Sequence, residues 1–219
     1  MLSGGLDSAT CLYWAKEKYY DISAITFNYY GRLMQEKRST ASLVKAAGVK
    51  NLIEIDLPFV KEAGDFFYDR RFKKNPDRDS GGGGWSSSYV PARNMIFYSI
   101  AAHYAEYLDA KWIIGGHNLH DVKFFKDASK NYIDKLNRLF KEGCLLCNDG
   151  QAYQILLPLA EMNRKQIIEL AIDLKAPIEL TWSCHREGSV HCGECYACRQ
   201  RLEAFDLIGL KDPAFFFFK

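Results

Sequence analysis

The chain begins with a short glycine-containing segment that has the chemistry of a phosphate-binding loop. It reads M-L-S-G-G-L-D-S-A-T, and a predicted helix follows it directly. Gly4 and Gly5 allow a tight turn with no Cβ between the backbone and a ligand, and the helix start offers unpaired N–H groups and a positive dipole end. Ser3 and Ser8 add hydroxyl donors, and Asp7 can cap the helix or orient a Mg²⁺ ion. The segment therefore predicts a pyrophosphate site.

This loop differs from the P-loop of kinases. The pattern G-x-x-x-x-G-K-[ST] occurs nowhere in the sequence, so the lysine that reaches the terminal phosphates in such loops is missing. Transfer of a γ-phosphoryl group is therefore the less favoured chemistry. The segment alone also leaves open an ordinary serine- and glycine-rich turn that caps a helix.

Four of the seven cysteines gather near the C-terminus with the spacing of metal ligands. Cys184, Cys192, Cys195 and Cys198 form the pattern C-x7-C-x2-C-x2-C. Four thiolates suit a tetrahedral Zn²⁺ ion, and a complete set of four leaves no open position for catalysis. We therefore expect a structural zinc ion, which needs no neighbouring histidine as a ligand.

The other three cysteines carry less information. Cys144 and Cys147 have the C-x2-C spacing but no second pair, so packing near a helix end is the favoured interpretation. Cys11 lies on the first predicted helix and is most simply a core residue.

Composition limits the possible partners and location of the protein. Lysine plus arginine (29) nearly balances aspartate plus glutamate (27), which gives no argument for a nucleic acid or an acidic membrane as partner. The 219 residues are 48% hydrophobic, enough for a substantial core. No apolar run has the length of a membrane span, and no secretory signal pattern follows Met1. We expect a cytosolic globular protein that binds anions locally.

Apolar and amphipathic segments alternate along most of the chain and predict the elements that position these groups. Helices are expected at 6–20, 35–47, 91–108, 132–140, 163–174 and 196–207, and strands at 22–28, 52–57, 111–115 and 153–157. Gly48 has a C-cap role, and Asn163 with Gln166 forms a capping box. The alternation predicts an α/β fold with a Rossmann-like, doubly wound parallel sheet. We place this domain at 1–180 and a zinc-binding segment with a helix, packed on the same domain, at 181–219.

A long segment at 58–89 interrupts the pattern. Its inner stretch D-R-R-F-K-K-N-P-D-R-D-S-G-G-G-G-W-S-S-S is first basic and then glycine-rich, and the basic residues of that stretch are Arg70, Arg71, Lys73, Lys74 and Arg78. The segment is either a solvated insertion or a lid whose basic side chains approach an anionic ligand.

The whole set of motifs resembles one known family. S-G-G-L-D-S resembles the loop of PP-loop, or N-type, ATP pyrophosphatases. T-F-N-Y-Y-G-R-x-x-x-E at 26–36, Y-V-P-A-R-N at 89–94, G-G-H-N-L-H-D at 115–121 and the cysteine tail extend the likeness. Together they resemble the 7-cyano-7-deazaguanine synthase family nearly end to end. The resemblance implies a Rossmann-like fold, a four-cysteine zinc site and a homodimer.

The resemblance also implies a reaction. The family converts 7-carboxy-7-deazaguanine and ammonia to the nitrile with ATP and Mg²⁺, for queuosine or archaeosine in tRNA. The carboxylate is adenylated and ammonia forms an amide, whose oxygen is adenylated in turn and eliminated. Because AMP is a good leaving group, such catalysis depends on positioning and charge stabilisation more than on a protein nucleophile.

Matching positions assign an ATP-binding stretch to the opening segment. Its members are Leu2, Ser3, Gly4, Gly5, Leu6, Asp7, Ser8, Ala9, Thr10, Cys11 and Leu12. The glycines, the serines and Asp7 would lie nearest the phosphates, and Asp7 and Ser8 would be catalytic.

Three residues outside the loop are assigned in the same way. Arg93 would be catalytic and face ATP or the acyl adenylate, or else is a solvated first-turn arginine. Asp121 and Asp127 would contact the substrate with Arg93, or else are solvated carboxylates. The family commonly has D-x-S-G-Y-P-D where this chain has D-V-K-F-F-K-D, with Phe125 and Lys126 in place of tyrosine and proline.

Two other interpretations compete with this one. A different PP-loop adenylating enzyme, which thiolates tRNA or amidates a deazaguanine acid, would need another nucleophile, and a thiolating enzyme would use the cysteine pair at 144 and 147. A zinc-ribbon module that binds nucleic acid predicts a basic stripe beside the cysteines. Arginines at 186, 199 and 201 supply charge there, but glutamates at 187, 194 and 203 offset it.

The two ends of the sequence are unusual. Only Met1 and Leu2 precede the loop, whereas such loops normally follow a buried strand. We expect that a few native residues of that strand are missing from the sequence, or that Met1 is not the biological start. If the native chain does begin here, the sheet lacks a central strand and the ATP site is poorly ordered. At the other end, four phenylalanines at 215–218 should dock on their own domain or on a partner subunit.

Overall fold

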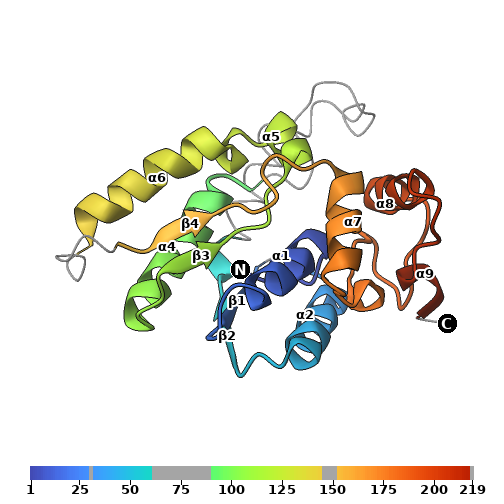
Figure 1. The fold of residues 1–219 in the computed structure, drawn as a ribbon, viewed down its shortest axis with the longest axis horizontal. Coiled ribbons are helices and arrows are strands. Elements are labelled where there is room, and N and C mark those ends of the chain that lie inside the picture. Colours follow the sequence, from blue (N-terminus) through green and yellow to red (C-terminus); the bar gives the residue numbers. More distant parts are fainter. Residues whose placement is uncertain (30–31, 61–89, 145–151, 218–219) are drawn as a thin grey trace.

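The computed structural model describes residues 1–29, 32–60, 90–144 and 152–217 of the chain (Figure 1). Strand β1 (Ser23–Asn28) pairs in parallel with β2 (Asn51–Asp56), and β3 (Trp112–Ile114) pairs in parallel with β4 (Gln154–Leu156). The helices are α1 (Leu6–Lys16), α2 (Met34–Ala47), α4 (Arg93–Tyr107), α5 (Leu119–Phe124), α6 (Lys130–Gly143), α7 (Arg164–Asp173), α8 (Tyr196–Asp206) and α9 (Ala214–Phe217), with 3₁₀ turns η3 (Lys126–Ala128) and η5 (Ile178–Leu180). The predicted α/β fold with parallel strands is confirmed.

Helices cover both faces of the strands. On one face of the first pair, Ala24 of β1 packs with Leu43 of α2 and Ala9 of α1; on the other, Phe27 stacks on Phe97 of α4 with ring centroids 4.2 Å apart. The second pair likewise lies between α4 and α6 on one side and α1 and α7 on the other. This arrangement is the doubly wound pattern that alternating strands and helices predict.

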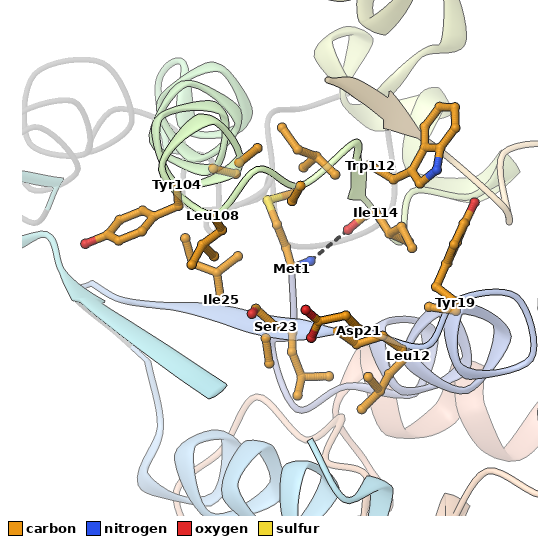
Figure 2. A pocket seen from close by; sticks show the side chains of 18 of the residues that line it. Met1, Leu12, Tyr19, Asp21, Ser23, Ile25, Tyr104, Leu108, Trp112 and Ile114 are labelled. Atoms are coloured by element: carbon orange, nitrogen blue, oxygen red, sulfur yellow. Dashed lines mark hydrogen bonds between the residues drawn. The ribbon is translucent and has the colours of Figure 1, made fainter. Parts of the chain in front are cut away.

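The first two residues lie between the two strand pairs. The Met1 amine donates to Ile114 O at 2.7 Å, and the Leu2 N–H donates to Ile25 O at 2.8 Å. Figure 2 shows the first of these bonds between two residues that line a mainly apolar cavity of about 450 Å³, which lies between β1, α1, α4 and β3. Met1 and Leu2 therefore connect β1 and β3 and lead straight into the loop. The expectation about residues ahead of Met1 stays a prediction.

Most predicted elements occur within a few residues of the expected positions. Gly48 ends α2 with a φ of 69°, and Asn163 Oδ1 accepts the Gln166 N–H at 3.0 Å at the start of α7. The first helix is shorter than predicted. It ends at Lys16, because Ala15 O accepts N–H groups from both residue 18 and residue 19 in a closing turn. The basic residues of the predicted lid, and Cys147, lie outside the described residues.

The C-terminal elements gather at one end of the molecule, at the right in Figure 1. Their centre is the buried ion pair of Arg201 and Asp212, whose side chains are 2% and 0% exposed. Arg201 Nε donates to Asp212 Oδ2 at 2.5 Å, and the guanidinium also donates to Thr181 Oγ1 and Ser183 Oγ at 2.8 and 3.0 Å. This network ties α8 and the chain end to the segment after η5.

The tail packs on the same end. Phe215 stacks on His191 with ring centroids 4.9 Å apart and contacts the cysteine cluster, so the predicted docking on the chain's own residues is confirmed for Phe215, while the side chains at 216–218 lie outside those described. Over the part of the chain that is described, no helix has the length and apolar character needed to cross a membrane. The boundary placed between 180 and 181 stays a prediction.

Candidate functional site

The turn before α1 depends on glycine at position 4. Gly4 has a φ of 96°, and a Cβ there would lie 2.5 Å from the backbone oxygen of Glu36 on α2. Its carbonyl oxygen accepts the Trp182 N–H at 2.9 Å and the Ser39 hydroxyl at 3.1 Å. The turn is thus held between α2 and the segment that leads to the cysteines, and only glycine fits there.

Two serines fix the inside of this turn. Ser8 Oγ accepts the Ser3 N–H at 3.2 Å, donates to Gly5 O at 2.9 Å and lies 3.1 Å from Ser3 Oγ. Gly5 is the N-cap of α1, and the following backbone N–H groups belong to the first turn, where a helix supplies no acceptors. The turn therefore presents donors and a positive dipole end to an anion.

Most of the predicted ATP-binding stretch is buried. Seven of its eleven residues are in this class: Leu2, Gly4, Ser8, Ala9, Thr10, Cys11 and Leu12. The apolar side chains among them hold the loop in place, and the Ser8 hydroxyl is bonded within the turn. Burial raises the pKa of the Cys11 thiol to about 12, and its Sγ lies 3.6 Å from Gly115 O. Cys11 is the neutral core residue that its position predicts.

Two predicted site carboxylates, Asp7 and Asp121, lie together at the start of α1 and α5. Asn118 connects them: its Nδ2 donates to Asp7 Oδ2 at 2.7 Å, and its backbone N–H donates to Asp121 Oδ2 at 3.2 Å. Burial raises the pKa of Asp7 to about 6, and the nearby charge of Asp121 adds to the increase. Burial also raises the pKa of Asp121.

Two arginines supply the opposite charge. The positive charge of Arg164 opposes the burial-driven increase in the pKa of both Asp7 and Asp121, and Arg93 opposes the increase for Asp121. The Arg93 guanidinium also lies 5.9 Å from the centre of the Phe125 ring. Within the described chain, the buried Arg164 Nε has no hydrogen-bond partner. The result is a polar group of two carboxylates and two guanidiniums beside the loop.

A histidine and a tyrosine complete this group. His117 Nδ1 lies 3.9 Å from Asp121 Oδ2, and burial lowers the pKa of its ring to about 4, which leaves it neutral. Its Nε2 and the Tyr98 hydroxyl are buried, and among the residues described neither has a hydrogen-bond partner. Asp127, the third predicted carboxylate, lies on η3, and its charge contributes to the raised pKa of Tyr98. Such buried polar atoms are typical of a ligand site.

Arg32 reaches the loop from the other side. Its guanidinium donates to Ser3 O at 3.4 Å, to Thr40 Oγ1 at 2.8 Å and to Asn28 Oδ1 at 2.7 Å. The side chain therefore links β1, α2 and the turn. The cavity of Figure 2, by contrast, lies on the core side of α1 with a mainly apolar lining, and offers few donors to a phosphate.

The four predicted metal ligands come together in the structure. The sulfur atoms of Cys184, Cys192, Cys195 and Cys198 all lie within 4.8 Å of one another. Two of the Sγ–Sγ distances are 3.9 and 4.0 Å, and the Glu194 and Cys195 N–H groups donate to Cys192 Sγ at 3.4 and 3.3 Å. Such donors favour thiolates, so this cluster can hold a metal ion.

The cysteine cluster is connected to both halves of the site. Trp182 donates from its backbone to Gly4 O and from Nε1 to Cys184 O, both at 2.9 Å. Tyr196, at the start of α8, has its hydroxyl 3.1 Å from His120 Nε2 on α5. The cluster is therefore linked to the glycine turn through Trp182, two positions before Cys184, and to α5 beside the polar group through the contact of Tyr196 with His120.

Sequence reasoning missed several of these residues. Asn118 and His117 lie inside the motif G-G-H-N-L-H-D, in which only Asp121 was given a role. The spacing N-x-x-D of Asn118 and Asp121 is a capping-box pattern that could have identified Asn118. Arg164 follows a recognised cap, but only the folded structure shows that it lies near Asp7. Arg32 also lies in a recognised motif, T-F-N-Y-Y-G-R, but no role was predicted for it.

The fold and the site together define an α/β protein with a glycine turn suited to an anion, a polar group beside that turn, and a four-cysteine cluster that can hold a metal ion. The family model described as "Queuosine biosynthesis protein QueC" matches residues 1–209. Many curated relatives carry the name 7-cyano-7-deazaguanine synthase. The one from Nostoc punctiforme is 36% identical over 97% of this chain and 96% of its own length, and that from Methanobrevibacter smithii is 34% identical over 98% and 95%. The chain belongs to the QueC family.

Two solved structures are similar at lower identity. NMN synthetase from Francisella tularensis is 17% identical with a TM-score of 0.46, over 96% of this chain and 76% of its own. The U34-tRNA thiolase NcsA from Methanococcus maripaludis, with its [4Fe-4S] cluster, is also 17% identical with a TM-score of 0.46, over 94% and 63%.

Proposed function

We propose that this chain is an ATP-dependent 7-cyano-7-deazaguanine synthase. The observation that supports the proposal is that the glycine turn lies beside the polar group around Asp7 and Asp121. Relatives with that name also match this chain over nearly their whole length. The turn receives the departing pyrophosphate and the polar group receives the acid. The enzyme thereby forms C–N bonds at the expense of ATP, in queuosine or archaeosine biosynthesis.

The loop residues bind the nucleotide in this proposal. Backbone N–H groups of the first turn of α1, with the hydroxyls of Ser3 and Ser8, hold the β and γ phosphates, and the helix dipole stabilises their charge. Asp7 supplies a carboxylate to Mg²⁺, which prefers such oxygen ligands and, when bound, neutralises phosphate charge.

The arginines act on the acid and its adenylates. Arg93 and Arg164 balance the negative charge that forms when a carboxylate oxygen attacks the α phosphate and pyrophosphate leaves. Ammonia then displaces AMP, which gives the amide, and the amide oxygen attacks a second ATP. Loss of AMP and two protons from that adenylate leaves the nitrile. Asp121 accepts hydrogen bonds from the guanine-like edge, and Asp127 lies within the same substrate region.

The metal in the cysteine cluster is proposed to be a structural Zn²⁺. Four sulfurs at about 2.3 Å from one tetrahedral ion lie about 3.8 Å apart, close to the distances of 3.9 and 4.0 Å in the cluster. The complete set of four thiolates leaves the ion no position for substrate. Its proposed role is to hold the segment at 181–219, and through Trp182 the glycine turn.

Homodimer formation and the use of ammonia as the nitrogen donor are proposals that follow from the family, and a cytosolic location and the lack of direct nucleic-acid binding are proposals that follow from the composition. The zinc-ribbon alternative gains no specific support from the structure, because Glu194 pairs with Arg186 at 2.8 Å beside the cysteines. The thiolation alternative depends on Cys147, which lies outside the described residues.

Product analysis tests the proposed function. The chain is incubated with ATP, Mg²⁺, ammonium and 7-carboxy-7-deazaguanine, and base and nucleotide are identified by mass spectrometry. We expect the nitrile and AMP; ADP as the nucleotide product, or an unchanged acid, would contradict the proposal. Arg93→Ala should lower kcat/KM by roughly 100-fold, whereas Arg38→Ala, an exposed arginine on α2, should leave it unchanged.

A further inference from the structure

Asn118 makes contacts in two directions from a fully buried position. Its side chain is 1% exposed. The amide Nδ2 donates to Asp7 Oδ2 at 2.7 Å across to α1, while Oδ1 accepts the N–H groups of His120 and Asp121 at 2.7 and 3.2 Å as the N-cap of α5. The reverse orientation of the amide would place its NH₂ group against two N–H donors, so the network fixes which atom is the donor.

We propose that Asn118 is a positioning residue that couples the two halves of the active site, holding the Asp7 carboxylate at the nucleotide turn while it anchors the backbone that carries Asp121. The inference rests on the proposed function. It adds a residue with a defined task to that function: one side chain sets the geometry between the nucleotide and the acid that must react with it.

The backbone around Asn118 supports this coupling. A Cβ on Gly116 would lie 3.4 Å from the backbone C of Asp7 and the backbone N of Ser8, so the β3–α5 connection packs directly on the first turn of α1. The Asn118 N–H also donates to Asp121 Oδ2 at 3.2 Å, which completes a capping box. Movement of either loop would therefore disturb the other through this contact.

Asparagine is the residue type that satisfies both tasks. Serine and aspartate cap helices well, but serine is too short to reach Asp7 and aspartate has no donor for it. Aspartate would also place a third carboxylate beside Asp7 and Asp121. Alanine loses both the cap and the bridge. These three substitutions therefore separate the capping function from the bridging function.

The test combines nucleotide binding with turnover. Affinity for the non-cleavable analogue α,β-methylene-ATP with Mg²⁺ is measured by calorimetry for the wild type, Asn118→Ser, Asn118→Ala, Asp7→Ala and the double variant Asp7→Ala/Asn118→Ser. Asn118→Thr, which also caps a helix and adds no charge, replaces the serine variant if that variant does not fold. Ser129→Ala, which removes the N-cap of α6 where Ser129 Oγ accepts the Tyr132 N–H at 3.3 Å, is the control for a lost cap.

The proposal predicts a specific pattern. Asn118→Ser weakens analogue binding roughly 10- to 100-fold, the range for a lost hydrogen bond to a charged group, and changes the KM for the acid by less than about twofold. Asn118→Ala weakens nucleotide binding and raises that KM as well. The double variant binds no more weakly than Asp7→Ala alone, and Ser129→Ala binds as the wild type does.

Two results would overturn the proposal. In the first, the losses of analogue affinity caused by Asp7→Ala and Asn118→Ser multiply in the double variant, which shows that they are independent. In the second, Asn118→Ser binds the analogue as tightly as the wild type does. The outcome is separable from that of the proposed function. If the binding pattern holds but the wild type forms no nitrile, the proposed function fails and the Asp7–Asn118 coupling stands. If nitrile forms but the effects multiply, only the coupling fails.

Discussion

Replacement of Gly4 by alanine should damage the glycine turn in a way that the structure quantifies. Gly4 has a φ of 96°, and its added Cβ would lie 2.5 Å from Glu36 O and 3.0 Å from Thr40 Oγ1. The left-handed backbone costs an alanine about 1 to 2 kcal/mol. Displacement of a backbone oxygen on α2 adds about 1 to 3 kcal/mol, the usual range for overpacking. The sum is about 2 to 5 kcal/mol in the free energy of unfolding.

Gly48 provides a matched control for this substitution. Its φ is 69°, but a Cβ there meets nothing within 4 Å, so Gly48→Ala has only the backbone cost of about 1 to 2 kcal/mol. At about 2 to 4 °C per kcal/mol for a chain of this size, the Tm should fall by about 4 to 20 °C for Gly4→Ala and about 2 to 8 °C for Gly48→Ala.

Scanning calorimetry measures both Tm values, and titration with α,β-methylene-ATP measures binding. We expect Gly4→Ala to lose nucleotide binding and Gly48→Ala to retain it. The same Tm for the two variants, together with wild-type binding of the analogue by both, would contradict a tightly enclosed anion site at this turn.

Three further predictions concern other parts of the molecule. Arg201→Ala should lower the free energy of unfolding in urea by about 3 to 5 kcal/mol, because it leaves the buried Asp212 carboxylate unpaired; a change below about 1 kcal/mol would refute this. Removal of the metal with a chelator should release one zinc per chain, lower the Tm and weaken binding of the ATP analogue, because the Trp182 backbone holds Gly4 O; unchanged binding by a metal-free chain would show that the link has no role. Asp7→Asn, without nucleotide, should be more stable than the wild type at pH 7.5 by at most about 3 kcal/mol. Burial raises the pKa of Asp7 from 3.8 to about 6, so at pH 7.5 the wild-type carboxylate is ionised in a site that disfavours its charge, and this lowers the free energy of unfolding. This gain should disappear as the pH falls to about 4, where the wild-type carboxyl is protonated; a gain that persists there would contradict the cause given.

The sequence predicted the helices and strands well where a local rule decides them. The capping box at Asn163 and the C-cap at Gly48 depend on side-chain and backbone chemistry within one turn, and the structure contains both. The cysteine cluster was also predictable, because its spacing leaves few alternatives to a shared ion. The end of α1 was not, because residues 17–20 have no breaker and the closing turn at Ala15 gives no strong signal.

The candidate site shows the limit of reasoning along the chain. Asp7 and Asp121 were each identified, but their connection runs through Asn118, 111 positions from Asp7. Arg164 likewise meets Asp7 only because α1 and α7 pack against each other. Pairings of this kind depend on tertiary packing, which no local pattern contains.

Transfer of the acid's oxygen atoms to AMP is a direct test of a reaction that passes through two adenylates. The chain is given 7-carboxy-7-deazaguanine labelled with ¹⁸O at both carboxylate oxygens, together with ATP, Mg²⁺ and ammonium, and the AMP and the base are analysed by mass spectrometry. We expect two AMP for each nitrile, each carrying one ¹⁸O, because both carboxylate oxygens leave the base as part of AMP. Unlabelled AMP, a single AMP with the amide as final product, or ADP would contradict it.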